Sequence, residues 1–237
     1  LGGRAGEQCS GEGEQVFVGY DRLLVETDVL SYRVSDNSVG LTLRENPFYV
    51  ESGGQVSDGG VVRGPGWTLT VTQVVKLGGV TAILGNVQGE FNASSDESFE
   101  VVAEVARSAR YDTIRNHTAT HLLHAALRSV LGEHVVQRGS LVDPDRLRFD
   151  FSHTGPMTEA ERDEVEAIVN EGVWADHPVH IDSRPYAEAV AAGAMALFGE
   201  KYADEVRVVN VPGVSMELCG GTHVASTGNI GLVRIVG

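Results

Sequence analysis

The sequence predicts an α+β protein, in which a small N-terminal β-barrel precedes an α+β domain built from an antiparallel sheet and helices. Short runs rich in Val, Leu and Thr, separated by Gly, Asn and Pro, occupy the chain up to about residue 104. From residue 107 the pattern changes to amphipathic helices with strands between them. Histidines and a cysteine in this second part have the spacing of a zinc site, so we expect the second domain to contain zinc.

The first part of the chain divides into a tail and a barrel. Residues 1–14 are rich in Gly, Glu and Ser and lack apolar periodicity, which predicts a flexible tail. Residues 15–106 form the expected β-barrel, although a sandwich has the same pattern. The predicted strands cover residues 23–30, 38–44, 59–62, 67–76, 80–87 and 98–105.

The second domain is expected over residues 107–237. An apolar stripe with helical spacing predicts a helix over 112–131, with Asp112 as N-cap and Gly132 as the residue after its end. Strands follow within 135–152. A Thr-Glu-Ala-Glu capping-box pattern then opens an acidic helix over 158–175.

Four residues in this domain have the chemistry and spacing of ligands for one zinc ion. They are His117 and His121, separated by three residues, and Cys219 and His223, also separated by three. Two histidines four positions apart project from one face of a helix. Such a pair alone is more often made of surface or core histidines, but the Cys-Gly-Gly-Thr-His segment reverses that preference. Its two glycines allow the sharp turn that brings thiolate and imidazole together.

Two further motifs have both a functional and a structural interpretation. His124 lies one turn beyond His121, where core packing or support of the ligands explains it without a fifth ligand. Gly53, Gly54 and Gln55 form a Gly-Gly-Gln loop that could bring backbone N–H groups close to an RNA end. Gly-Gly alone is more often a turn that needs positive φ.

Composition limits the classes of function. The chain has 237 residues and a formal net charge of −15, which opposes indiscriminate binding to nucleic acid, so RNA contact requires a local basic patch. Two such clusters flank the predicted helix: Arg107, Arg110 and Arg115 before or within it, and Arg138, Arg146 and Arg148 after it. Only two cysteines and no apolar run of membrane-spanning length indicate a reducing, cytoplasmic location and no membrane. The start at Leu1 suggests a piece cut from a longer polypeptide.

Six segments, in order, resemble the editing region of alanyl-tRNA synthetases. They are PFYVESGGQV at 47–56, HTATHLLHAAL at 117–127, QRGSLV at 137–142, RFDFSH at 148–153, GAMALFGEKY at 193–202 and LCGGTH at 218–223. The resemblance extends from about residue 17 to the C-terminus. It implies an aminoacyl-tRNA deacylase that removes serine or glycine from wrongly charged tRNA(Ala), with one zinc ion as cofactor.

The resemblance also implies roles for individual residues and partners. Thr120 and Gln137 are expected in the catalytic pocket, where they orient the substrate or water; a Thr120 hydroxyl bonded back to a helical carbonyl is the structural alternative. Gly53, Gly54 and Gln55, with Arg115 and Arg138, are expected to contact the acceptor end of tRNA(Ala). The parent enzyme would be an ATP-dependent alanine–tRNA ligase whose remaining domains are partners. This chain lacks the aminoacylation domain, so it should hydrolyse but not charge.

Other functions compete with this expectation. A free-standing trans-editing deacylase is the nearest alternative, and a nonenzymatic, zinc-stabilised tRNA-binding module is the second. A zinc peptidase lacks its general base, because no Glu follows His117. The related editing domain of threonyl-tRNA synthetase ends in Cys-x-His, which differs from the segment here. Four protein ligands could also complete a tetrahedral ion, so whether zinc activates water or positions the substrate stays open.

Overall fold

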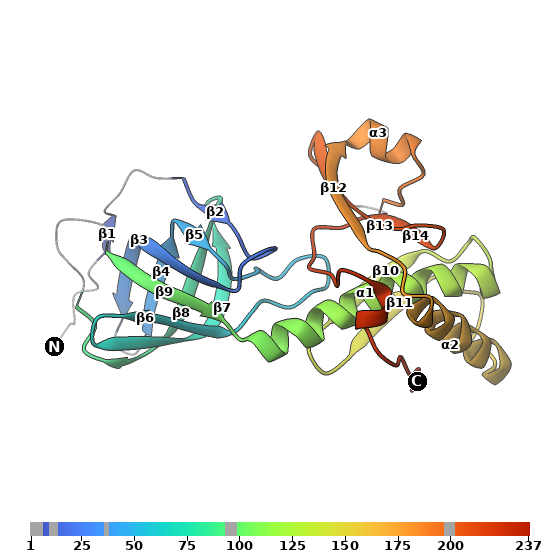
Figure 1. The fold of residues 1–237 in the computed structure, drawn as a ribbon, viewed down its shortest axis with the longest axis horizontal. Coiled ribbons are helices and arrows are strands. Elements are labelled where there is room, and N and C mark those ends of the chain that lie inside the picture. Colours follow the sequence, from blue (N-terminus) through green and yellow to red (C-terminus); the bar gives the residue numbers. More distant parts are fainter. Residues whose placement is uncertain (1–6, 10–13, 36–37, 93–98, 197–201) are drawn as a thin grey trace. The chain divides into compact units, whose positions relative to one another are not determined.

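A computed structural model describes residues 7–9, 14–35, 38–92, 99–196 and 202–237 (Figure 1). The chain divides into two compact units. The first comprises Leu1–Glu51 and Val56–Arg110, and the second comprises Ser52–Gln55 and Tyr111–Gly237. None of the helices in the described part combines the length and apolar character that a membrane crossing needs.

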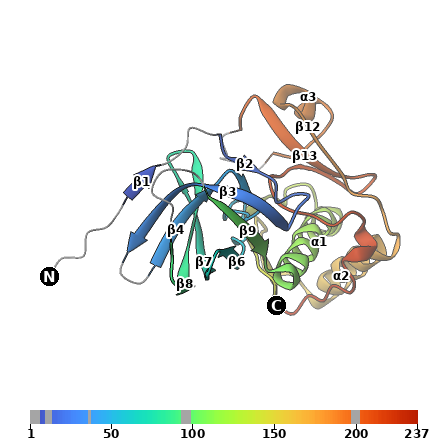
Figure 2. The same ribbon diagram turned by 60° about the vertical axis from the view of Figure 1, so that its left-hand side comes forward.

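The first unit is a closed antiparallel β-barrel of six strands (Figures 1 and 2). In order around the barrel, these are β3 (Leu24–Ser35), β4 (Ser38–Leu43), β8 (Val80–Gly89), β7 (Trp67–Leu77), β6 (Gly60–Gly64) and β9 (Glu100–Val105). The pairing of β9 with β3 closes the sheet, which confirms a barrel rather than a sandwich. Each predicted strand overlaps one of the six, although residue 98 of the last prediction lies outside the described residues.

Side chains that point inward from alternate positions of the strands fill the barrel. In β4 every second residue is buried, because successive side chains of a strand point to opposite faces. Leu41, Leu43, Leu69 and Ile83 are at most 1% exposed and form the centre of the core.

Two short pairings extend this unit. β2 (Val16–Phe17) pairs in parallel with β5 (Glu45–Asn46). β1 (Glu7–Cys9) pairs antiparallel with β3 at residues 31–33, so part of the expected tail over 1–14 is a strand. A strand edge presents unpaired backbone groups that an adjacent segment can bind without any apolar pattern, which explains the difference. Residues 1–6 and 10–13 of the expected tail lie outside the described residues.

The second unit combines helices with antiparallel sheets, which confirms the α+β class. Its helices are α1 (Arg107–Leu131, of which Tyr111 onward belongs to this unit), α2 (Glu159–Trp174), α3 (Tyr186–Ala191) and the 3-10 helix η1 (Thr227–Asn229). One sheet pairs β10 (Gln137–Val142) with β11 (Leu147–Phe151); the other orders β12 (His180–Pro185), β13 (Glu205–Val211) and β14 (Ser215–Leu218). Leu122 and Leu127 of α1 pack with Val165 and Val169 of α2 in the core of this unit.

The ends of the helices separate the correct predictions from the wrong one. Gly132, with φ of 114°, follows α1, and Thr158 caps α2 in a complete capping box with Glu161, so both of these predictions are confirmed. Asp112 is not the N-cap of α1, because the helix begins five residues earlier, at Arg107. The Arg110 N–H donates to the Ala106 carbonyl at 3.0 Å, which extends the helix back to the end of β9.

Candidate metal centre

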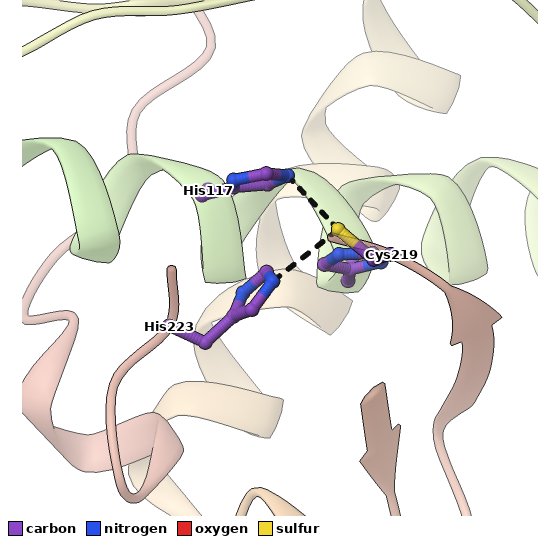
Figure 3. A group of neighbouring side chains, drawn as sticks. His117, Cys219 and His223 are labelled. Atoms are coloured by element: carbon purple, nitrogen blue, oxygen red, sulfur yellow. Dashed lines mark hydrogen bonds between the residues drawn. The ribbon is translucent and has the colours of Figure 1, made fainter. Parts of the chain in front are cut away.

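The four predicted ligands of the second unit lie together. The ligand atoms of His117, His121, Cys219 and His223 are all within 4.8 Å of one another. α1 carries the first two, whose rings are stacked with centroids 5.5 Å apart, as residues one turn apart can be. Cys219 follows β14, and its Sγ lies 3.4 Å from Nε2 of His117 and 3.4 Å from Nε2 of His223 (Figure 3).

The donor set and its spacing fit a tetrahedral zinc ion. Zinc bonds of about 2.0 Å to nitrogen and about 2.3 Å to sulfur place neighbouring tetrahedral donors about 3.5 Å apart. Both contacts of the Cys219 sulfur match that separation. Both ring nitrogens of His121 are buried without a hydrogen bond among the described residues; Nδ1 has Glu217 Oε2 at 3.0 Å, whereas Nε2 is left with a lone pair that a metal ion would satisfy. Three imidazoles and one thiolate are ligands typical of zinc.

The Cys219–His223 segment is held against α1 by a close contact and a fixed loop. A Cβ added to Gly221 would lie 2.0 Å from Cε1 of His117, so the imidazole occupies the space of any side chain there. A Cβ added to Gly220 would have no neighbour within 4 Å. Arg207 donates to the carbonyls of Cys219 at 3.0 Å and Gly221 at 2.7 Å, which fixes the turn. Close approach, rather than positive φ, requires the second glycine.

Each of the three candidate histidine ligands has its Nδ1 beside one oxygen atom. The pairs are His117 with Gln55 Oε1 at 2.7 Å, His121 with Glu217 Oε2 at 3.0 Å, and His223 with Thr118 Oγ1 at 3.3 Å. The Thr118 hydroxyl donates to the Ile114 carbonyl, so towards His223 its oxygen accepts. An imidazole that donates from Nδ1 keeps Nε2 available as a ligand. All three rings therefore offer the same nitrogen to the cluster.

The Gly-Gly-Gln loop supports the cluster from within the second unit. Gln55 is 0% exposed, and its Oε1 accepts from the Thr222 N–H at 2.9 Å as well as from His117. The Gly54 carbonyl accepts from the N–H of Val142 in β10 at 2.7 Å. Gly53 and Gly54 have φ of 60° and 86°, as the turn interpretation requires. The Gln55 side chain faces the candidate ligands rather than solvent, which differs from the expected contact with RNA.

A buried carboxylate lies beside His121. Glu217 in β14 and His124 in α1 are 5% and 4% exposed. Oε1 of Glu217 lies 3.2 Å from Nδ1 of His124 and accepts from the Ser215 hydroxyl at 2.9 Å. His124 is not one of the four clustered residues, in agreement with its expected supporting position.

Burial and charge set the protonation of this group. Burial opposes ionisation of the Cys219 thiol, but His117 and His223 outweigh it and lower the pKa of that thiol well below its usual value. Burial also lowers the pKa of His223, to about 3, with His117 adding to the effect. For His121 burial is outweighed by the Glu217 carboxylate, which raises the pKa of that imidazole to about 10. Against its own burial, Glu217 has a lowered pKa because of His121 and then His124.

A thiolate and a neutral His223 are the forms that bind a metal. At His121 a metal ion would replace the proton on Nε2, while Nδ1 keeps its proton beside the Glu217 carboxylate. The protonation of the group is thus compatible with zinc.

The two predicted catalytic residues, Thr120 and Gln137, form no hydrogen bond with the four candidate ligands among the described residues. The Thr120 hydroxyl is buried and donates to the Asn116 carbonyl at 2.8 Å, the bond to a helical carbonyl that is the structural alternative for this residue. Gln137 is half-buried and opens β10 opposite Phe151.

The arginines separate into surface and buried groups. Arg115 and Arg138 are exposed; Arg115 pairs with Asp112 at 3.3 Å. Arg146 and Arg148 are also exposed and pair with Asp143 and Asp150.

Arg110 does not fit the expected surface patch, because only 3% of it is exposed. Its guanidinium forms a buried ion pair with Asp58 and donates to the carbonyls of Gly19 and Pro47. Arg110 is therefore a structural residue of the first unit. A basic residue near a functional motif in sequence need not share its surface.

Sequence reasoning missed the residues that orient the ligands. Glu217, Thr118 and the inward-facing side chain of Gln55 belong to this group. One signal was available for Glu217: it is a carboxylate between Met216 and Leu218 in a strand that otherwise offers few polar side chains, two residues before Cys219. Nothing in the sequence connects Gln55 with Thr222, which is 167 residues away.

Known proteins resemble this chain over nearly its whole length. Alanine--tRNA ligase of Chlorobaculum tepidum is 50% identical over 236 residues, which cover 95% of this chain and 27% of the relative. The corresponding enzymes of Halorhodospira halophila and Staphylococcus aureus (strain bovine RF122 / ET3-1) are 46% and 51% identical, over 99% and 93% of this chain and 28% and 26% of their own lengths. Residues 206–237 also match the family described as the threonyl and alanyl tRNA synthetase second additional domain. The chain thus spans about a quarter of the length of the curated relatives it matches.

Proposed function

Because this chain belongs to the alanine–tRNA ligase family over the segment that it shares with those enzymes, we propose that it proofreads tRNA(Ala). The reaction is hydrolysis of the ester that joins serine or glycine to the terminal ribose. The observation that supports it most directly is the group of three imidazoles and one thiolate within 4.8 Å. The whole parent protein would be an ATP-dependent alanine–tRNA ligase that acts in the cytoplasm, where translation uses its product.

Zinc is the proposed cofactor, held by His117, His121, Cys219 and His223. When bound, it supplies a Lewis acid that polarises the ester carbonyl, lowers the pKa of a water molecule or holds the substrate amine. Gln55 and Thr118 orient two of the imidazoles through their Nδ1 atoms. Four protein ligands can occupy all four positions of a tetrahedral zinc ion, so other groups would have to orient the substrate or water. We propose that Thr120 and Gln137 do so beside the ion.

Selectivity for serine over alanine requires recognition of the hydroxyl, since alanine is the smaller residue. A polar pocket achieves this because alanine would leave buried polar groups unpaired there. The Thr120 hydroxyl gives its hydrogen to the Asn116 carbonyl, so its oxygen retains lone pairs that can accept a hydrogen bond from serine. Thr120 is therefore our candidate for hydroxyl recognition.

Contact with the acceptor end of tRNA is assigned to exposed groups of the second unit. The net charge of −15 leaves RNA binding dependent on local basic side chains. Arg115 and Arg138 are exposed, as is the backbone of Gly53 in the glycine loop. We assign the two arginines to phosphate groups and the glycine loop to the RNA end.

A nonenzymatic, zinc-stabilised tRNA-binding module is the second candidate. The completeness of the four-ligand set favours it, because structural zinc sites are closed by four protein ligands, whereas catalytic sites keep one position open. This candidate predicts tRNA binding without ester hydrolysis.

Deacylation of serine-charged and alanine-charged tRNA(Ala) by the purified chain tests the proposal. We expect rapid loss of serine, little loss of alanine, inhibition by a chelator and recovery when zinc is restored. Cys219→Ala should be inactive, whereas Cys9→Ala, which removes the only other cysteine, serves as the matched control. If the folded, zinc-loaded chain binds tRNA but cleaves neither ester, the binding module replaces the deacylase.

The same preparation tests the RNA contacts. An Arg115→Ala/Arg138→Ala double variant should bind tRNA more weakly and show a shallower dependence of affinity on salt, since each lost phosphate contact reduces counterion release. Arg63→Ala in the first unit removes an exposed arginine and is the control. An unchanged salt slope in the double variant removes these two arginines from the proposed interface.

A further inference from the structure

Glu217 is a buried ionisable group that the proposed hydrolysis does not use. It is 5% exposed, and its two carboxylate oxygens face different neighbours. Oε2 lies 3.0 Å from Nδ1 of His121, while Oε1 faces His124 at 3.2 Å and accepts from Ser215 at 2.9 Å. A buried carboxylate is costly unless it is paired, so its place beside a candidate ligand calls for an explanation.

We propose that Glu217 is a positioning residue of the metal centre, which holds His121 with Nε2 towards the metal and supplies a compensating negative charge. This inference rests on the proposed binding of zinc but not on the deacylase reaction. Its geometry follows from the 3.0 Å approach of Glu217 Oε2 to Nδ1, because a ring that has the carboxylate on this side directs its Nε2 lone pair away from Glu217.

The second oxygen keeps the carboxylate from turning. Ser215, two residues earlier in β14, donates its hydroxyl to Oε1, and His124 lies against the same atom from α1. With Oε1 engaged from both elements, Oε2 stays on the side of His121. The position of His124, one turn beyond His121, thereby gains a purpose as a support for the carboxylate rather than as a fifth ligand.

Charge distinguishes Glu217 from the other orienting groups. Gln55 and Thr118 hold His117 and His223 through neutral oxygens. A zinc dication bound by one thiolate and three neutral imidazoles keeps a net positive charge, which is unfavourable in a buried site. The Glu217 carboxylate neutralises that charge. Loss of the charge should therefore weaken metal binding even where an acceptor oxygen is kept beside His121.

Two substitutions separate orientation from charge. Glu217→Gln keeps a carbonyl oxygen that can accept from His121, whereas Glu217→Ala removes both the acceptor and the charge. Substitution of a residue that supports a metal ligand typically lowers metal affinity about 10–100-fold. We expect zinc affinity to fall about tenfold in Glu217→Gln and about 100-fold in Glu217→Ala. Glu205→Gln, on the exposed face of the neighbouring strand β13, should bind zinc as the unchanged chain does.

The measurement is competition for zinc against a chromophoric chelator, with the absorption of bound cobalt as a probe of ligand geometry and circular dichroism as a probe of folding. Glu217→Gln should retain the cobalt spectrum of the unchanged chain, and Glu217→Ala should alter it. Unchanged affinity and spectrum in both folded variants would overturn the proposal.

Folding defects also give an answer. A variant that folds only at raised zinc concentration supports the proposal, since its defect is then in metal binding. Variants that stay unfolded at every zinc concentration overturn it, because the carboxylate would then serve the fold alone. If the unchanged chain itself binds no zinc, the proposed metal centre fails, and that result is distinct from either outcome for Glu217.

Discussion

Gly220 and Gly221 are neighbours in the chain, yet their surroundings differ. A Cβ on Gly221 would collide with His117 at 2.0 Å from Cε1 and 2.4 Å from Nδ1, whereas Gly220 has open space around it. Real Cβ atoms do not approach other atoms so closely, so either the imidazole or the loop has to move. Neither neighbour can shift freely, because Gln55 holds the ring and Arg207 holds the loop.

Gly221→Ala is therefore expected to displace the His117 ring and weaken zinc binding by about tenfold or more. Gly220→Ala is its matched control, with the same change of residue one position earlier and no steric conflict. Competition with a chromophoric chelator measures both affinities. Equal affinities in the two variants would show that the loop absorbs the extra methyl group, so that contact with His117 does not explain the glycine.

At this scale the sequence indicated the candidate ligands but not the groups that orient them. Helical spacing and the Cys-Gly-Gly-Thr-His segment are local patterns, so His117, His121, Cys219 and His223 could be named from the sequence. Gln55 lies 62 residues from His117 and reaches it only through the tertiary fold. Glu217 likewise meets His121 only when β14 and α1 come together.

At the scale of elements, the sequence predicted a helix boundary correctly where all the residues that form the boundary are close together in the chain. The Thr158 hydroxyl accepts from the N–H of Glu161, and the Glu161 carboxylate accepts in return from the N–H of Thr158. All partners lie within four consecutive residues, so the pattern could be read directly. At its start α1 begins at Arg107, and the guanidinium of Arg110 in its first turn is anchored by Asp58, 52 residues earlier. Asp112 is a residue type that commonly caps helices, but α1 begins five residues before it, at Arg107.

Thr158→Ala should lower the free energy of unfolding by about 1 kcal/mol, because the Glu161 N–H loses its partner at the start of α2. Urea denaturation followed by circular dichroism measures the change. The hydrogen bonds from Thr158 hold the pKa of Glu161 below its usual value, so the contribution of this carboxylate is present at neutral pH and lost on acidification.

The control for this substitution is Thr154→Ala, another exposed threonine just before the helix. It should leave the unfolding free energy nearly unchanged. A loss of similar size in both variants would mean that the threonines act through the loop rather than through the cap.

At the scale of the whole molecule, strand content could be predicted but strand order could not. Each barrel strand was visible as a β-branched run between turn residues. Closure, however, depends on pairing Leu24 of β3 with Glu104 of β9, and no local pattern encodes a contact over that separation. The same applies to the second unit, which includes residues 52–55 from within the barrel sequence. The loop that carries Gln55 therefore belongs to one unit by sequence position and to the other by contacts.

This division leads to a prediction for metal removal. All four candidate ligands belong to the second unit, so a chelator should destabilise that unit and leave the barrel unaffected. A metal that binds only the folded state raises the free energy of unfolding by about 4 kcal/mol when its concentration is a thousandfold above its dissociation constant. This contribution disappears when the metal is removed. Circular dichroism at the helical minimum follows the second unit, which contains α2 and most of α1.

The chain has two tryptophans, Trp67 in the barrel, 3% exposed, and Trp174 at the end of α2, 73% exposed. Trp174→Phe leaves Trp67 as a fluorescent probe of the barrel alone. In this variant a chelator should lower the melting temperature measured by circular dichroism by several degrees and leave the melting temperature measured by Trp67 fluorescence unchanged. In Cys219→Ala, which lacks one candidate ligand, the chelator should change neither melting temperature. An equal shift of both transitions would mean that the two units unfold together, because a metal bound to one unit can stabilise the other only if their unfolding is coupled.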